Sequence, residues 1–142
     1  MVGILIISIV IALDALVQAW VFSILQDNSK PIAVTPFFNF VEVWNHGISF
    51  GMFNNLAYGQ WILSLVALMI SIFLIHLLLR AASSFEVMAY SLIVGGAAGN
   101  VIDRVSYGAV ADYLDFHAFG YHWPAFNVTD SAIFIGVAFL LM

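Results

Sequence analysis

Four long apolar stretches dominate the pattern of this chain, and most polar residues lie between them. The stretches cover residues 2–25, 61–79, 85–102 and 128–142. A helix needs about 20 predominantly apolar residues to cross a bilayer core, and the first three stretches come close to that length. The fourth is shorter, which would suit a chain trimmed at its end. We therefore expect a bundle of four transmembrane helices.

The connections between these stretches differ in length. Arg80–Glu86 is a tight turn, whereas residues 27–60 form a long connection. Within it, Pro36–Trp44 (PFFNFVEVW) is rich in aromatic and β-branched residues with partial alternation, which predicts a strand. Residues 45–47 (NHG) then supply turn chemistry before Ile48–Phe53. Lipid-exposed strands cannot cross a bilayer unless they close into a barrel, so we expect an extended hairpin at the membrane surface.

The composition narrows the class of protein. A mean hydropathy of +1.09 with 8% charged residues excludes an ordinary soluble domain, where roughly a quarter of residues are charged. The absence of cysteine excludes disulfides, thiolate catalysis and cysteine-based zinc sites. A net charge of −5 argues against nucleic acid as a partner. With no repeat, linker or cleavable signal in view, residues 1–142 are expected to form a single integral membrane domain.

Carboxylates gather in one part of the chain. Four of the six aspartates lie between residues 95 and 131, namely Asp103, Asp112, Asp115 and Asp130. Acids beside membrane helices are expensive to keep, so a function is their default explanation. Asp112 and Asp130 are typical of a paired-acid site, in which one carboxyl keeps a proton while the other acts as a base. The helix end favours ionised Asp130, so we expect Asp112 to carry the proton.

The two remaining acids of this region are competitors for the same role. Asp115 could be a solvated loop acid, and spacing alone does not choose between it and Asp112. Asp103 precedes Arg104 at a helix end, where a local ion pair or interfacial exposure is expected.

Several other residues have two readings that the pattern leaves open. Gly96, Asn100 and Arg104 fall on one helical stripe, which either lines a polar site or closes a structural network. We expect Asn100, Arg104 and Asn127 to hold the loop between the third and fourth stretches. Asn127 is a good helix N-cap, and Asp130 three residues later approximates a capping box.

Polar residues inside the other stretches are fewer. Asp14 and Gln18 share one face of the first helix and either glue the bundle or support the site. Gly95 and Gly99 are spaced for close helix packing. The four histidines (His46, His76, His117 and His122) do not have metal-ligand spacing, and we expect neither a metal nor another cofactor.

Together these residues resemble bacterial lipoprotein signal peptidase (signal peptidase II), a family of integral inner-membrane aspartic peptidases. Four blocks carry the resemblance over nearly the whole chain: ALDALVQAW around Asp14, TPFFNFVEVWNHGISFGMF at 35–53, GGAAGNVIDR at 95–104, and VADYLDFHAFGYHWPAFNVTDSA at 110–132.

The resemblance implies an activity and a set of site residues. The family cleaves the signal peptide of diacylglyceryl-modified prolipoproteins before the lipidated cysteine, without a cofactor or metal. Its catalytic aspartates correspond to Asp112 and Asp130, which leaves Asp115 outside the pair. The residues that correspond to its site-support and substrate-binding positions are Asp14, Asn45, Gly47, Gly96, Asn100, Arg104 and Asn127.

The resemblance also implies a setting for the chain. A multi-pass protein of the bacterial inner membrane is expected, with both termini in the cytoplasm and the acids near the extracytoplasmic face. A small extracytoplasmic β-sheet platform would cradle the substrate. The expected partners are lipid-modified prolipoproteins and membrane lipids, not nucleic acid, and a monomer is expected.

The chain departs from the family pattern at three places. Where the family usually has DQxxK, Asp14 is followed by Ala15 and the lysine position is Gln18. The turn reads NHGISFG instead of NTGAAFG, and the usual basic tail is missing. None of these departures touches Asp112 or Asp130.

Two other function classes share part of this pattern. A transporter or proton-relay protein also places acids and histidines in membrane helices, but it predicts acids spread along the spans, whereas most lie together here. An inactive scaffold relative is the other alternative, and the retention of both Asp112 and Asp130 argues against it. The peptidase is the preferred hypothesis.

Overall fold

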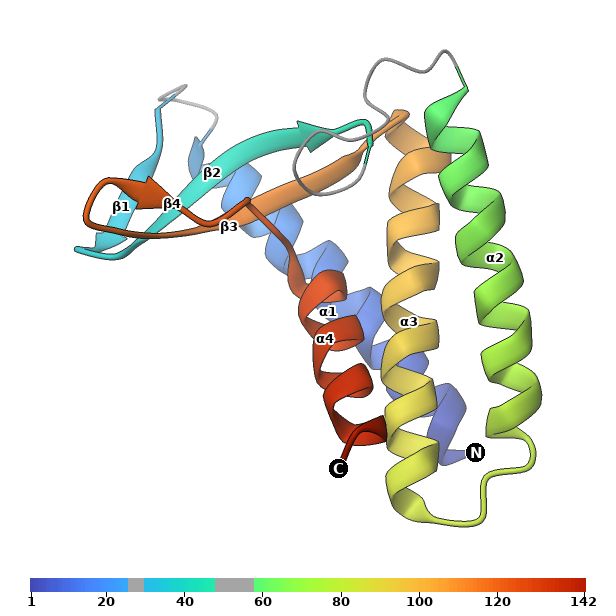
Figure 1. Cartoon of the computed structure of the whole chain (residues 1–142). Helices are drawn as coiled ribbons and strands as arrows, with labels where there is room; N and C mark the ends of the chain where they lie inside the picture. Colours follow the sequence, from blue (N-terminus) through green and yellow to red (C-terminus); the bar gives the residue numbers. More distant parts are fainter. Residues whose placement is uncertain (26–29, 48–57) are drawn as a thin grey trace.

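The computed structural model describes residues 1–25, 30–47 and 58–142, which form a helical bundle with a sheet across one end (Figure 1). In chain order the elements are α1 (Val2–Leu25), β1 (Ile32–Thr35), β2 (Phe38–Asn45), α2 (Gly59–Leu78), α3 (Ser84–Tyr107), β3 (Val110–Ala118), β4 (Tyr121–His122) and α4 (Val128–Leu140). The expected combination of apolar helices and a small antiparallel sheet is confirmed. Both chain ends lie at the end of the bundle away from the sheet (Figure 1).

Helix α3 is the centre of the bundle, in contact with α1, α2 and α4. Its small residues allow this. A side chain at Gly95 would press on Ile7 and Val10 of α1, and one at Gly99 would meet the Thr129 side chain of α4. Glycines at such points let helix backbones approach closely, so the expected packing role of Gly95 and Gly99 agrees with the structure.

The helices differ from the expected spans at several ends, most of all at the C-terminal end of the third. Helix α3 continues past residue 102 to Tyr107 and stops at Gly108, whose positive φ of 77° suits glycine at a helix C-terminus. Among the described helices, α1, α2 and α3 are long and apolar enough to cross a membrane, whereas α4 has 13 residues. At about 1.5 Å per residue, a helix of that length is shorter than a bilayer core of about 30 Å.

The sheet is antiparallel with strand order β1-β2-β3-β4. The strand predicted at 36–44 is present as β2. The second arm expected at 48–53 lies outside the described residues. Instead, β2 pairs with β1 on one side and, on the other, with β3 from a distant part of the chain, so that Val43 lies opposite Asp112 and Asn39 opposite Asp115. Strand β3 was not predicted as a strand, and it carries two of the acids.

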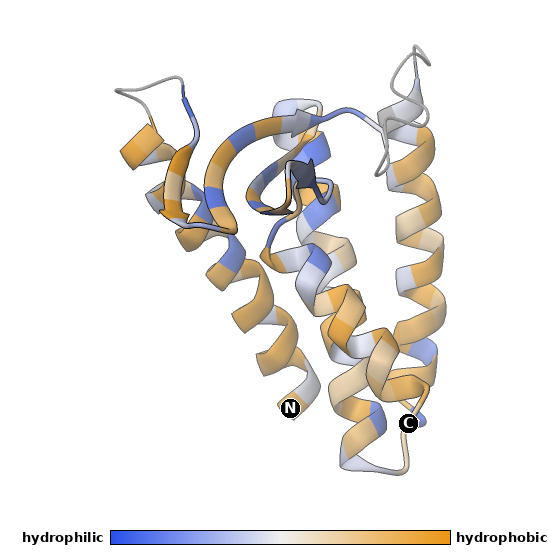
Figure 2. Ribbon diagram, turned by 60° about the vertical axis from the view of Figure 1, so that its left-hand side comes forward, coloured by the Kyte–Doolittle hydropathy of each residue, from blue (hydrophilic) through white to orange (hydrophobic). Residues whose placement is uncertain are grey.

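Apolar clusters join these parts. Val21 and Leu25 at the end of α1 pack with Tyr113 of β3, which attaches the sheet to the bundle. A second cluster, formed by Leu74, Ile93 and Val94, lies between α2 and α3. The helices are coloured predominantly hydrophobic in Figure 2, and several hydrophilic positions lie where the sheet meets the helices.

The close approach of α3 and α4 yields a first prediction. An alanine Cβ at Gly96 would run into the Thr129 carbonyl oxygen and lie 2.6 Å from Ile133 Cγ1. Because the carbonyl oxygen belongs to the backbone, relief requires moving a helix. We expect Gly96→Ala to lower the free energy of unfolding by about 1–3 kcal/mol, measured by thermal or denaturant unfolding in detergent.

Gly3→Ala is the matched control for Gly96→Ala. Its new Cβ would lie 2.9 Å from the Ser91 hydroxyl, which is the end of a side chain. Alanine also favours a helix over glycine by up to about 1 kcal/mol, so we expect a near-neutral change. Equal losses in the two variants would contradict the assigned contact between α3 and α4.

Candidate active site

Asp112 lies on β3 where the sheet meets the helices, and its side chain is almost fully buried at 2% exposure. Two amides donate to it. Asn45 Nδ2 is 3.0 Å from Asp112 Oδ2, and Asn127 Nδ2 is 3.0 Å from Asp112 Oδ1. Both carboxylate oxygens therefore have a neutral donor, one from β2 and one from the residue that precedes α4.

Asp130 lies in the first turn of α4 and is only partly buried. Its carboxylate Oδ1 accepts a hydrogen bond of 2.9 Å from Asn100 Nδ2 of α3. Its backbone N–H donates to Asn127 Oδ1 at 2.8 Å. The expected N-cap is thus present, whereas the Asp130 side chain bonds to Asn100 instead of closing a capping box. This leaves the Asp130 carboxylate with one amide donor and one partly exposed side.

The side chain of Asn127 connects the two acids. It is fully buried, with its amide nitrogen on Asp112 and its amide oxygen on the backbone of Asp130. Its oxygen also accepts from the Thr129 hydroxyl at 2.7 Å. The same nitrogen lies 3.3 Å from the Ala111 carbonyl oxygen. One side chain therefore fixes the end of β3 relative to the start of α4.

The electrostatics of the pair are unequal. Burial, and next the nearby negative charge of Asp130, raise the pKa of Asp112 from 3.8 to about 7, although the Asn45 hydrogen bond acts in the opposite direction. Asp112 therefore holds a proton over much of the range below neutral pH. That Asp112 is the protonated member of the pair stays a prediction.

Arg104, Gly47 and Asn45 form a chain of contacts that ends at Asp112. Arg104 Nη2 donates to the Gly47 carbonyl oxygen at 3.2 Å. The Gly47 N–H donates to Asn45 Oδ1 at 3.0 Å, and Asn45 bonds to Asp112. A second guanidinium nitrogen donates to the Asn100 carbonyl oxygen at 3.3 Å. The expectation that Arg104 holds the loop between α3 and α4 is wrong, because its partner outside α3 follows β2.

That loop is held by Asp103 instead. Asp103 is buried, and its Oδ2 accepts the Ala111 N–H at 3.0 Å. The expectation of interfacial exposure for this acid is therefore wrong. This hydrogen bond joins two residues that are close in the sequence, and it fixes the turn between α3 and β3.

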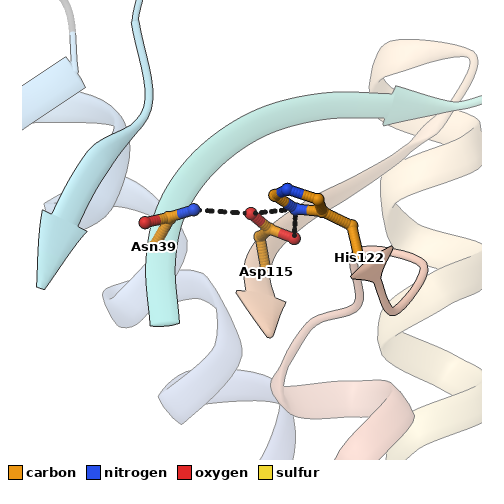
Figure 3. A network of polar contacts seen from close by, with 3 residues as sticks. All are labelled: Asn39, Asp115 and His122. Atoms are coloured by element: carbon orange, nitrogen blue, oxygen red, sulfur yellow. Dashed lines mark hydrogen bonds and ion pairs between the residues drawn. The ribbon is translucent and has the colours of Figure 1, made fainter. Parts of the chain in front are cut away.

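Asp115 is a buried, paired acid, so the alternative that it is a solvated loop acid is wrong. Asn39 Nδ2 donates to it at 2.8 Å, and His122 Nδ1 lies 2.8 Å and 3.0 Å from its two oxygens (Figure 3). Burial alone would raise the pKa of Asp115, but the hydrogen bonds from His122 and Asn39 outweigh it and lower the pKa. Residues three apart on a strand point to opposite faces, which separates Asp115 from Asp112.

Asp14 has partners that the sequence did not suggest. The Tyr113 hydroxyl donates to Asp14 Oδ1 at 2.8 Å, and the Thr129 N–H donates to the same oxygen at 3.3 Å. Gln18 is buried on the same helix. Asp14 therefore lies beneath the start of α4. The sequence did not point to its partners Tyr113 and Thr129, nor to Asn39 and His122 as the partners of Asp115.

A groove of about 690 Å³ opens beside Asp130. Apart from Asp130 and Ser131 its lining is apolar, and it follows the outer side of α4. The lining residues are Trp123, Pro124, Ala125, Phe126, Asp130, Ser131, Ile133, Phe134, Ile135 and Val137. An extended or lipid-like apolar ligand could therefore lie against α4 with a polar group at Asp130.

Comparison with known proteins identifies relatives of the whole arrangement. The profile of the signal peptidase (SPase) II family matches residues 6–142. A lipoprotein signal peptidase of Serratia marcescens is 48% identical over 106 residues, which are 74% of this chain and 62% of that protein. One of Alteromonas mediterranea is 42% identical over 116 residues, 80% of this chain and 64% of that protein. The chain thus spans less than two thirds of the length of these two relatives.

Other relatives match over nearly the full chain. A lipoprotein signal peptidase of Anaplasma phagocytophilum is 35% identical over 140 residues, 99% of this chain and 89% of that protein. Two solved bacterial membrane enzymes superpose with a TM-score of 0.83 each, at 31% and 30% identity. These alignments cover 99% of this chain and 85% and 90% of those chains.

The raised pKa of Asp112 predicts how stability depends on pH. The folded chain keeps this proton up to about pH 7, whereas the unfolded chain releases it near 3.8. Between these values the folded state binds more protons, so the free energy of unfolding falls as pH rises. Each unit between the two pKa values corresponds to about 1.4 kcal/mol. Unfolding measured from pH 4 to 8 should show wild type losing stability relative to Asp112→Asn.

Asp115→Asn provides the opposite sign when the same unfolding measurement is extended below pH 4. Because the pKa of Asp115 is lowered in the folded state, its stabilising contribution is present above the unfolded pKa and is lost as the pH falls. Wild type should therefore lose stability relative to Asp115→Asn on acidification. Identical pH dependence of the two variants would contradict the assigned environments.

Proposed function

The chain belongs to the signal peptidase (SPase) II family, and we propose that it is an aspartic endopeptidase that removes the signal peptide from lipid-modified prolipoproteins. The observation that carries the proposal is the unequal pair of acids on either side of Asn127. Asp112 is buried and holds a proton to about pH 7, whereas Asp130 is partly exposed at the groove. A protonated and an ionised carboxyl in one site are the requirements of acid–base peptide hydrolysis.

In the proposed reaction one carboxyl acts as a general base and the other as a general acid. Ionised Asp130 takes a proton from a water molecule whose oxygen bonds to the carbonyl carbon of the scissile peptide. When the C–N bond breaks, Asp112 gives its proton to the departing amine. The proton then resides on Asp130, and the pair returns to its starting state by exchange of that proton. Because the two groups are coupled, they titrate as a unit.

The amides around the acids support this division of labour. Asn45 and Asn127 donate to Asp112, and Asn100 donates to Asp130. Neutral donors orient a carboxyl without adding a positive charge, so the acids keep the mutual repulsion that leaves one of them protonated. We propose these three amides as orienting residues, with Arg104 and Gly47 acting through Asn45.

The surroundings of the site support a membrane-bound substrate. The chain is a membrane protein by its apolar helices, and the groove beside Asp130 is apolar along α4. We propose that the signal peptide or its attached lipid lies there. A bacterial inner-membrane location follows from the family, with both termini in the cytoplasm. The sheet and the site, at the end of the bundle away from the termini (Figure 1), would then face the extracytoplasmic side.

The whole chain is proposed to act as one unit and as a monomer in contact with membrane lipids. Residues of α1, α3, α4, β2 and β3 all contribute side chains to the site, so no separate part of the chain contains it. The transporter alternative is not favoured. The acids around the site lie together at one end of the bundle and share hydrogen-bond partners, whereas a transporter would have acids along a path through the bundle.

The first test of the function is cleavage by carboxamide variants. Purified chain in detergent is incubated with a diacylglyceryl-modified prolipoprotein, and release of the signal peptide is followed. Asp112→Asn and Asp130→Asn remove the acid and the base while keeping side-chain size, so each should lower turnover by at least roughly 10²–10⁴-fold. Both should still bind the lipidated substrate.

Asp115→Asn is the matched control, because Asp115 is a buried β3 acid that pairs with Asn39 and His122 on the other face of the strand. It should keep most activity. Near-normal turnover of either variant of the pair, or a loss confined to Asp115→Asn, would overturn the assignment of catalytic residues.

The second test concerns Arg104. Arg104→Ala removes two hydrogen bonds from a buried guanidinium, so we expect a loss of stability of roughly 1.5–3 kcal/mol. Turnover per folded molecule should fall as well, because Gly47 would no longer hold Asn45 against Asp112. Arg80→Ala, at an exposed position, should change neither. Lower stability with normal turnover would restrict Arg104 to a structural role.

A further inference from the structure

The first turn of α4 has unusual hydrogen-bond partners. The first backbone N–H groups of a helix have no acceptor within the helix. Here the Val128 N–H donates to the Tyr113 hydroxyl oxygen at 3.3 Å, and the Thr129 N–H donates to Asp14 Oδ1 at 3.3 Å. The acceptors come from β3 and α1, far away in the sequence. The start of α4 is therefore hydrogen-bonded to two other elements, in addition to its own N-cap.

The two acceptors are themselves joined. The Tyr113 hydroxyl donates to Asp14 Oδ1 at 2.8 Å, so one oxygen of Asp14 receives both the phenol and the Thr129 N–H. Tyr113 has no exposed surface, and Asp14 is 5% exposed. Burial and the adjacent Asp14 carboxylate raise the pKa of Tyr113 above its ordinary value. The phenol keeps its proton and can donate to Asp14 while it accepts from Val128.

The position of Tyr113 in the chain relates this contact to the acid pair. Tyr113 directly follows Asp112 on β3, and adjacent residues of a strand point to opposite faces. One face therefore presents Asp112 to Asn45 and Asn127, while the other places the Tyr113 hydroxyl under the turn that carries Asp130. Two consecutive residues of one strand thus bond to the start of α4, Asp112 with Asn127 and Tyr113 with Val128.

We propose that Tyr113 is a positioning residue for the reaction: its hydroxyl joins Asp14 to the first turn of α4 and so holds Asp130 at its working distance from Asp112. The proposal rests on the proposed peptidase function and adds to it a residue outside the acid pair and its amide donors. Asp14 acts through Tyr113 and Thr129 and touches neither carboxyl of the pair.

Tyr113→Phe removes the hydroxyl and keeps the ring that packs on Val21 and Leu25. With Asp130 displaced, the chemical step should slow while the groove stays intact, so we expect kcat to fall about ten-fold or more with KM within about two-fold of wild type. Activity is expressed per folded molecule. Tyr107→Phe, at an exposed tyrosine of α3, removes an equivalent hydroxyl and should leave both constants unchanged.

A double-mutant cycle with Asp14→Ala, which removes the oxygen that accepts both hydrogen bonds, separates positioning from stability. If Tyr113 and Asp14 act as one connection, the double variant should lose scarcely more kcat than the more damaged single variant. Independent losses that multiply, or a normal kcat for Tyr113→Phe with only a lower melting temperature, would overturn the proposal. Should Tyr113→Phe fail to fold, Asp14→Ala decides alone, and a normal kcat in that variant overturns it.

Hydrogen exchange tests the same contact without any cleavage assay. The Val128 and Thr129 amides should exchange faster in Tyr113→Phe than in wild type, whereas those in the middle of α3 should not change. Unchanged exchange of the two amides would overturn the proposal even if the enzyme is active. A wild-type chain that cleaves no prolipoprotein would contradict the proposed function, while the exchange result would still decide whether Tyr113 holds the turn.

Discussion

A buried carboxylate must receive hydrogen bonds, and this requirement determines how the elements of the molecule meet. An isolated acid in an apolar interior is costly unless it is paired or neutralised. Here each acid of the site region receives donors from another element or from a distant residue: Asp14 from Tyr113 and Thr129, Asp103 from Ala111, Asp112 from Asn45 and Asn127, Asp115 from Asn39 and His122, and Asp130 from Asn100. The acids are thus the points at which helices and sheet are joined.

Small residues of α3 make this joining possible. Gly96 and Gly99 leave no side chain between α3 and Thr129, so α4 lies close enough for Asn100 to reach Asp130. Larger residues at these two positions would separate the helices by about the width of a side chain and break that bond. The same glycines of α3 therefore determine both the packing of the helices and the geometry of the acids.

The sequence allowed much of this to be predicted. Long apolar runs predict α1, α2 and α3, and the N-cap pattern predicts the start of α4 at Asn127. Strand β3 was missed because its acids and aromatics hide the alternation, and its pairing with β2 is a contact between distant segments. Without β3, the spacing of the acids alone does not separate Asp115 from Asp112. The partner of Arg104 was missed for the same reason, since Gly47 reaches it only through the fold.

The unequal exposure of the two acids sets the direction from which the site can be reached. Asp112 is enclosed by Asn45 and Asn127, whereas Asp130 borders a groove whose walls are apolar residues of α4 and of the segment that precedes it. That groove opens along a helix surface of the kind that faces lipid. For the proposed reaction, a peptide anchored in the same bilayer would approach by lateral diffusion, a search in two dimensions that never requires its apolar segment to enter water. Access to this site is then governed by the membrane as much as by the protein.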